Sequence, residues 1–89
     1  MQIRNLKWDI DAWEDYLYWQ KQDKKMLKKI NLLIKDTLRD PFDGIGKPEA
    51  LKENLSGLWS RRINDEHRLV YVVEESSILI FSCKGHYDD

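Results

Sequence analysis

The residues between 40 and 57 divide this 89-residue chain into two parts with different sequence patterns. The stretch reads DPFDGIGKPEALKENLSG and holds both prolines and three of the four glycines of the chain. Apolar residues recur at helical spacing before it and form short strand-like runs after it. This order is typical of an α+β domain, and we predict a single domain over residues 1–89. A long irregular connection in so short a chain also favours a functional role.

Two helices are predicted before the connection. The first has Asp11 as its N-cap, with Glu14 three residues further on. Asp23 is the predicted N-cap of the second, longer helix, and Pro41 limits its end. The apolar face expected of the first helix is formed by Trp13, Tyr16, Leu17 and Gln20. That of the second is formed by Met26, Leu27, Ile30, Leu33, Ile34 and Leu38.

Four segments are predicted to be strands, one before the helices and three after the irregular connection. They are residues 5–8, 58–63, 68–74 and 78–83. The last three are joined by short polar segments, which indicates an antiparallel meander. The predicted fold is therefore one twisted sheet with both helices on one face.

The charges are unevenly distributed although the net charge is only −1. Residues 21–62 carry eleven basic and six acidic groups, whereas both flanking segments are net acidic. This basic block is a candidate anion-binding face. For the lysines alone, the solvated side of the second helix is an equally good interpretation.

Composition also bears on the compartment. Cys83 is the single cysteine, so an intrachain disulfide is excluded, and no N-terminal apolar leader is apparent. No apolar run approaches the roughly 20 residues that span a bilayer. We expect a cytoplasmic protein without a membrane segment.

Three arginines in the segment SRRINDEHRLVY could bind phosphate, because a guanidinium offers two parallel charge-assisted hydrogen bonds. Arg61 and Arg62 are adjacent in a predicted strand, so their side chains point to opposite faces. Only one of them can share a face with Arg68. The competing interpretation for any one arginine is an ion pair with Asp65 or Glu66.

A second candidate set combines Glu49 in the connection with His86 near the C-terminus. A carboxylate, an arginine and a histidine are the groups that RNA cleavage through the 2′-hydroxyl requires: a base, a cation for the charged intermediate and an acid. Spacing alone does not show that they meet. A metal site is a weaker interpretation, since Cys83, His67 and His86 lack ligand spacing. No metal or cofactor is expected.

Several segments in the same order resemble the YoeB/Txe toxins of the RelE superfamily, which are ribosome-dependent mRNA endonucleases. They are DYLYWQ (15–20), KKINLLIKDTLRDPFDGIGKPEALK (28–52), NLSGLWSRRI (54–63), EHRLVY (66–71) and the terminal HY. The resemblance extends from Trp8 to Tyr87. It implies a RelE-like fold, no cofactor, and cleavage of translated mRNA in the ribosomal A site by attack of the 2′-hydroxyl.

The resemblance also implies roles for individual residues. Glu49 matches the family's general base, Arg68 the arginine that stabilises the transition-state phosphate, and His86 the general acid. The substrate-binding positions are matched by Lys52, Arg62 and Tyr87. This chain departs from the family pattern at its end, where Asp88 and Asp89 follow the tyrosine and would oppose an anionic substrate.

The implied partners are mRNA on the ribosome, a YefM/Phd-type antitoxin and, through the antitoxin only, operator DNA. A homodimer is also implied, and the aromatic residues Trp13, Tyr18 and Trp19 are candidates for its surface. Two other hypotheses remain. One is a catalytically weak, antitoxin-binding subunit that modulates operator binding, and the other is a metal-independent nuclease acting on free RNA.

Overall fold

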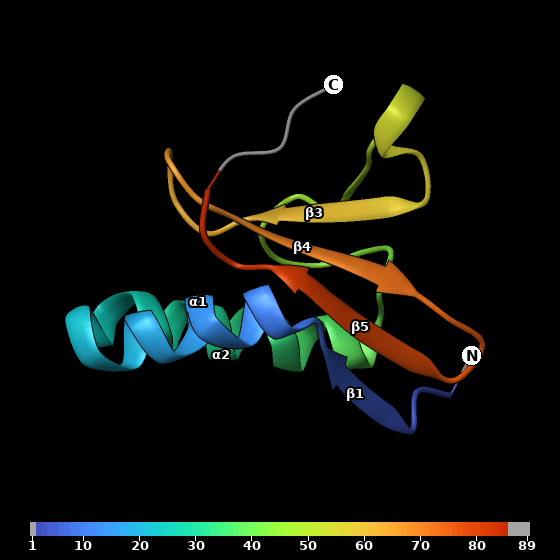
Figure 1. Cartoon of the computed structure of the whole chain (residues 1–89). Coiled ribbons are helices and arrows are strands. Elements are labelled where there is room, and N and C mark those ends of the chain that lie inside the picture. Colours follow the sequence, from blue (N-terminus) through green and yellow to red (C-terminus); the bar gives the residue numbers. More distant parts are fainter. Residues whose placement is uncertain (1, 86–89) are drawn as a thin grey trace.

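The structure is a computed structural model that describes residues 2–85, with two helices on one side of a sheet (Figure 1). The elements in chain order are β1 (Asn5–Trp8), α1 (Ile10–Gln22), α2 (Lys24–Arg39), β2 (Glu49–Ala50), the 3₁₀ turn η1 (Glu53–Leu55), β3 (Leu58–Arg62), β4 (Arg68–Val73) and β5 (Ser77–Ser82). Across residues 2–85 the strands form one sheet in the order β1-β5-β4-β3-β2. β1 is parallel to β5, and the other pairs are antiparallel. The predicted α+β fold is confirmed.

One strand was not predicted. β2 is only two residues long and lies inside the Pro- and Gly-rich connection, where no alternating pattern marks it. It adds a fifth strand at the edge beside β3. The rest of the sheet agrees with the prediction to within a residue or two at each strand end.

The first helix is rotated relative to its predicted face. Asp9, not Asp11, is the N-cap, and its carboxylate accepts a hydrogen bond from the Asp11 N–H at 3.0 Å. The buried residues are Ala12 and Trp19, whereas Trp13 and Leu17 are 41% and 38% exposed. The indole N–H of Trp19 donates to the carbonyl of Cys83 at 2.9 Å, which gives this ring a polar partner inside the core. The predictions that Asp11 caps the helix and that Trp19 is a surface aromatic are therefore wrong.

The second helix follows the prediction closely. The Asp23 carboxylate accepts from the Lys25 and Met26 N–H groups, so the predicted N-cap is confirmed. Ile30, Leu33 and Ile34 are buried in the core that the helices share with β4 and β5. Its lysines lie outside this core. No helix within residues 2–85 is long and apolar enough to cross a membrane.

A buried arginine joins the end of α2 to the sheet. The side chain of Arg61, on β3, has no solvent exposure and donates to the Asp36 carboxylate at 2.6 Å. Its other hydrogen bonds go to the hydroxyl of Tyr71 and to the carbonyls of Asp40, Asp43 and Ile45. Arg61 therefore holds the loop after α2 in place. Its ion-pair partner is Asp36 and not the predicted Asp65 or Glu66, which lie in the turn between β3 and β4.

We predict that Arg61→Lys lowers the free energy of unfolding by about 3 kcal/mol or more, because a lysine keeps the charge but lacks the planar fork, so several of the buried acceptors around Arg61 lose their donor. Urea unfolding of the purified protein measures this. The adjacent, exposed Arg62 provides the matched control, and Arg62→Lys should stay within about 0.5 kcal/mol of the wild type. Equal stability of the two variants would contradict the structural role of Arg61.

Acid sensitivity should follow from the same ion pair. Arg39 and Arg61 hold the pKa of Asp36 well below its ordinary value of 3.8. A carboxylate with a depressed folded-state pKa contributes stability above the ordinary pKa, and that contribution is lost as the pH falls below it. Asp36→Asn should therefore be less stable than the wild type at pH 7, with a difference that shrinks below about pH 4. Asp43→Asn, in the loop that follows α2, is the control, and urea unfolding midpoints measured between pH 7 and pH 3 test the prediction.

Candidate functional site

The short strand β2 determines where Glu49 lies. It pairs antiparallel with β3, so that Glu49 is opposite Ser60 and Ala50 is opposite Trp59. One further hydrogen bond, from the Leu51 N–H to the Leu58 carbonyl at 2.9 Å, continues the pairing. Residues that stand directly opposite each other in an antiparallel pair have side chains on the same face. Glu49 and Ser60 therefore share one face of the sheet.

The same face carries two arginines. Arg62 on β3 stands opposite Arg68 on β4, and Ser60 stands opposite Val70. Because side chains alternate along a strand, Ser60 and Arg62 are neighbours on this face. The register thus places Glu49, Arg62 and Arg68 on one face, as the predicted phosphate site requires.

The opposite face of these strands carries the core. Arg61, Leu69 and Tyr71 alternate with the site positions and are fully buried, and Leu69 and Tyr71 pack in the core that includes α2. The prediction that Arg61 and Arg62 point to opposite faces is confirmed, and Arg62 is the one on the same face as Arg68. The candidate site is consequently on the face of the sheet away from the helices.

The two arginines bring positive charge together. Among residues 2–85, neither Arg62 nor Arg68 forms an ion pair. The guanidinium of Arg68 donates to the carbonyls of Asn64 at 2.6 Å and His67 at 3.2 Å, which orients it without neutralising it. Like charges directly opposite each other in a sheet repel. An anion placed between them would relieve this repulsion, so the pair is suited to bind phosphate.

The backbone on both sides of β2 is in an unusual conformation. Lys47 and Glu53 have φ values of 53° and 55°, in the left-handed region that non-glycine residues rarely adopt. They bracket Glu49 and Lys52, and such residues are concentrated at functional sites. Lys52 is exposed and follows β2 by two residues, but the strand register does not fix its side chain.

The end of the described chain reaches the same site. The Gly85 carbonyl accepts from the Arg68 N–H at 2.9 Å. Its N–H donates to Nδ1 of His67, also at 2.9 Å. Gly85 is the last described residue, and His86 and Tyr87, like Asp88 and Asp89, lie outside the described residues. The structure therefore brings together the backbone positions of Glu49, Arg62 and Arg68 with the residue that precedes His86.

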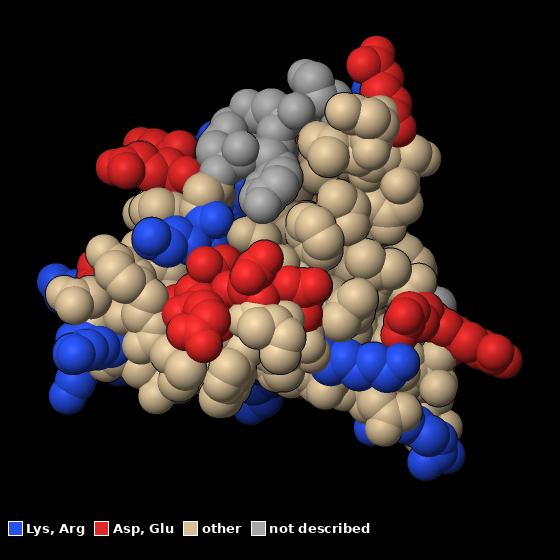
Figure 2. Space-filling model, viewed as in Figure 1, with Lys and Arg blue, Asp and Glu red and all other residues tan. Residues whose placement is uncertain are grey.

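The basic block of the sequence is divided between two regions. Arg39 and Arg61 pair with Asp36, and the lysines of α2 belong to the helical layer, away from the site face. In Figure 2, acidic side chains gather over α1, and basic side chains lie on both sides of them, at the end of the helices away from β1 and near β1. Of the basic residues in this block, only Lys52 and Arg62 belong to the predicted site.

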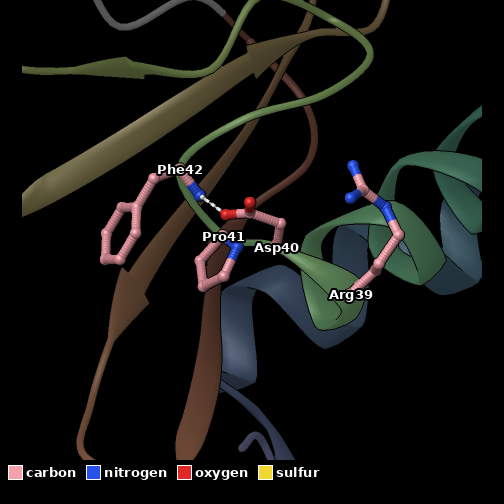
Figure 3. Close-up of a pocket in the computed structure, with 4 residues that line it drawn as sticks. All are labelled: Arg39, Asp40, Pro41 and Phe42. Carbon is pink, nitrogen blue, oxygen red and sulfur yellow. Dashed lines mark hydrogen bonds between the residues drawn. The ribbon is translucent and has the colours of Figure 1, made fainter. Parts of the chain in front are cut away.

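Two hollows in the described structure lie away from these residues. One, of about 340 Å³, is lined by Arg39, Asp40, Pro41 and Phe42 at the end of α2. Figure 3 shows the Asp40 carboxylate accepting a hydrogen bond from the Phe42 N–H within it, at 3.0 Å. The other, of about 480 Å³, is lined by Leu32, Lys35, Asp36, Arg39 and Ile45. Neither includes a residue of the predicted site.

Among the described residues, no three His, Cys, Asp or Glu side chains are grouped closely enough to hold a metal ion. Cys83 is buried, and burial raises the pKa of its thiol from 9.0 to about 12. A thiol in this environment stays protonated at neutral pH and is a poor nucleophile.

Sequence reasoning missed two residues that position the site. Asp36 supports the loop before β2 through Arg61, and His67 holds Gly85. His67 was considered only as a metal ligand. The signal that could have identified it is its position directly before Arg68, together with a glycine directly before His86. The pairing of these two segments is not visible in a sequence, however.

Comparisons with known proteins place this arrangement among bacterial toxins. Residues 8–87 match the family described as the YoeB-like toxin of bacterial type II toxin-antitoxin systems. Toxin YoeB of Escherichia coli K12 is 63% identical over 82 residues, covering 92% of this chain and 98% of that protein.

Solved structures agree. The YoeB dimer from Staphylococcus aureus has a TM-score of 0.87 and 55% identity, covering 98% of this chain and 100% of that one. YoeB in the YoeB-YefM complex from the same organism has a TM-score of 0.86 and 52% identity, with the same coverage. The predicted RelE-like fold is confirmed.

Gly85 provides a test of how the end of β5 is held. Its φ is +100°, and an added Cβ would have no atom of residues 2–85 within 4 Å, so an alanine there suffers backbone strain without a clash against the described residues. The strain of about 1–3 kcal/mol is large enough to break the hydrogen bonds that join Gly85 to His67 and Arg68. We predict that Gly85→Ala greatly reduces hydrogen-exchange protection of the residue 85 amide.

The matched control is Gly57, whose φ is +95° and whose added Cβ also meets nothing within 4 Å. Gly57 lies inside the chain, where breaking these two hydrogen bonds would not relieve the strain. Gly57→Ala should therefore lower the global free energy of unfolding by about 1–3 kcal/mol and leave the Gly85 amide protected. Full protection of the residue 85 amide in Gly85→Ala would show that the described geometry of Gly85 is not required.

Proposed function

This chain belongs to the YoeB-like toxins of bacterial type II toxin-antitoxin systems, and we propose that it is a ribosome-dependent endoribonuclease that cleaves translated mRNA in the A site. The observation that supports this function best is the strand register. It assigns Glu49, Arg62 and Arg68 to one face of the sheet, and the hydrogen bonds of Gly85 join the C-terminal segment to Arg68. Without β2, the carboxylate would have no fixed place beside the arginines.

In the proposed reaction Glu49 takes the proton from the 2′-hydroxyl of the scissile nucleotide. The 2′-oxygen then forms a bond to phosphorus, and the negative charge that develops on the phosphate oxygens is stabilised by Arg68 and Arg62. The bond from phosphorus to the 5′-oxygen breaks, and His86 donates a proton to that oxygen. The products are a 2′,3′-cyclic phosphate, which water can open to a 3′-phosphate, and a 5′-hydroxyl. This sequence of steps balances without a metal ion.

Lys52 and Tyr87 are proposed to bind the substrate on either side of the reacting phosphate. Lys52 lies two residues beyond the Glu49 strand and is exposed, so it can contact a neighbouring phosphate as a mobile point charge. The exposed positions of Glu49 and Lys52 leave room for a large substrate. A site that is shallow on its own is consistent with an mRNA that the ribosome holds and presents. The proposed compartment is accordingly the cytoplasm.

An antitoxin of the YefM/Phd type is the proposed protein partner, because a YoeB relative 52% identical to this chain was solved as a YoeB-YefM complex. An acidic antitoxin segment would be attracted to the same arginines that bind mRNA phosphates. Operator DNA is proposed to be bound through the antitoxin only.

A homodimer is the proposed oligomeric state, because the 55% identical relative was solved as a YoeB dimer. The aromatic cluster of Trp8, Trp13 and Tyr16 offers a partly exposed surface for it, with ring centroids 4.8–5.8 Å apart. Tyr18 is 44% exposed but its ring is covered on one side by the Lys84 ammonium, 4.4 Å from its centroid. Trp19 is buried and is not a candidate.

We predict that the protein alone cleaves mRNA on translating ribosomes and that Glu49→Gln lowers the single-turnover rate by about 10²–10⁴-fold, since the amide cannot accept the proton. Arg68→Lys should also lose at least about tenfold, because a lysine cannot contact two phosphate oxygens in one plane. Primer extension on a defined mRNA in a reconstituted translation system measures both rates.

Glu75→Gln, at an exposed position in the turn between β4 and β5, is the control and should cleave at the wild-type rate. Two outcomes would refute the proposal in different ways. A folded wild-type protein that binds an antitoxin but leaves mRNA intact would favour the catalytically weak, operator-modulating subunit. Equal cleavage of free and translated mRNA would favour the nuclease that acts on free RNA.

A further inference from the structure

We propose that His67 is a positioning residue for the cleavage reaction: its imidazole fixes Gly85 and thereby sets where the chain leaves the sheet toward His86. This inference rests on the proposed function, and it assigns to His67 no contact with the substrate. It is carried by the hydrogen bond from the Gly85 N–H to Nδ1 of His67, at 2.9 Å.

His67 is itself held on two sides. Its ring meets the ring of Trp19 edge to face, with 4.9 Å between centroids and 75° between planes. Its backbone N–H donates to the side chain of Asn64 at 2.8 Å, which closes the turn between β3 and β4. The backbone contact fixes where the side chain starts, and the contact with Trp19 supports the ring that presents Nδ1 to Gly85.

The acceptor role also defines the state of the imidazole. A histidine nitrogen accepts a hydrogen bond only through its lone pair, so Nδ1 carries no proton and the neutral ring is protonated on Nε2. His67 therefore acts here as a neutral acceptor. Packing against Trp19 alone would not require a ring with a hydrogen-bond acceptor nitrogen.

The residues just before Gly85 are held at several points, whereas the backbone of Gly85 itself has two hydrogen-bond partners among the described residues. β5 ends at Ser82. The next residue, Cys83, accepts a hydrogen bond from the Trp19 indole through its carbonyl and donates its N–H to the Asp15 carboxylate at 3.2 Å. Beyond these, the described contacts of the Gly85 backbone are the N–H of Arg68 and the ring of His67. His67 and the proposed catalytic residue Arg68 thus fix the N–H and the carbonyl of Gly85, the residue before His86.

This arrangement makes His67 important for geometry more than for stability. Removing the acceptor leaves the core intact, because Trp19 keeps its own hydrogen bond to Cys83. It frees the Gly85 N–H, so that of the described hydrogen bonds the one from the Arg68 N–H alone still holds the backbone of Gly85. A displacement of about 1 Å in a catalytic group can reduce a rate by about 10²-fold.

Two substitutions separate the acceptor from the ring. His67→Phe keeps an aromatic ring against Trp19 and removes the acceptor, whereas His67→Asn keeps an oxygen close to the place of Nδ1 and removes most of the ring. We expect His67→Phe to lower the single-turnover cleavage rate on translating ribosomes by about tenfold to a hundredfold, with ribosome affinity and melting temperature little changed. His67→Asn should retain most of the rate.

A second measurement does not depend on activity. Amide hydrogen exchange of Gly85, followed by NMR on the free protein, should be at least about tenfold faster in His67→Phe than in the wild type. His67→Asn should restore most of the protection. Concordant changes in exchange and in cleavage would support the positioning role.

The outcomes distinguish this inference from the proposed function. If the wild type cleaves and His67→Phe cleaves equally well, the positioning role is overturned and the proposed function stands. Equal losses in both variants with an unchanged Gly85 amide would overturn it as well, because ring packing would then be the cause. If the wild type fails to cleave translated mRNA, the proposed function falls and the role of His67 falls with it.

Discussion

The buried ion pair between Arg61 and Asp36 is the interaction on which the rest of this structure depends. Arg61 lies in the middle of the protein with no solvent exposure, and it joins α2, the loop after it and β3 through a single guanidinium. A buried charge is costly unless it is paired and fully hydrogen bonded. Arg61 meets that condition with a carboxylate, a hydroxyl and three carbonyls, so the loop that supplies these carbonyls has little freedom to move.

This constraint links packing to function. The loop held by Arg61 leads directly into β2, and the Gly46 carbonyl in that loop accepts from the Arg62 N–H, so the chain is already attached to β3 before Glu49 is reached. On the core face of β3 an arginine fixes the loop, and on the other face its neighbour Arg62 stands opposite Arg68. Two adjacent arginines thus have different tasks, one structural and one proposed to bind phosphate, because strand alternation separates them.

The local sequence predicted the parts of the fold that depend on periodicity. The stripe of α2 and the strands β4 and β5 were recognised because most of their buried positions are apolar. The buried face of α1 was assigned wrongly because its buried residues are the small Ala12 and a single aromatic, Trp19. β2 escaped because two residues cannot show an alternating pattern. For the site, residue chemistry singled out Glu49, Arg68 and His86 as candidates, and the resemblance assigned a role to each of them. The contacts of Arg61 and His67 could not be predicted, since they join segments far apart in the sequence.

The central claim is that Glu49 and the two arginines act on an RNA phosphate through the adjacent 2′-hydroxyl. The most direct test places one 2′-deoxy nucleotide at the scissile position of an mRNA programmed into the ribosomal A site, with the all-ribose mRNA as control. The account predicts cleavage of the control to a 2′,3′-cyclic phosphate and a 5′-hydroxyl, and no cleavage of the 2′-deoxy mRNA at that position. Cleavage of both at the same rate would contradict the proposed chemistry.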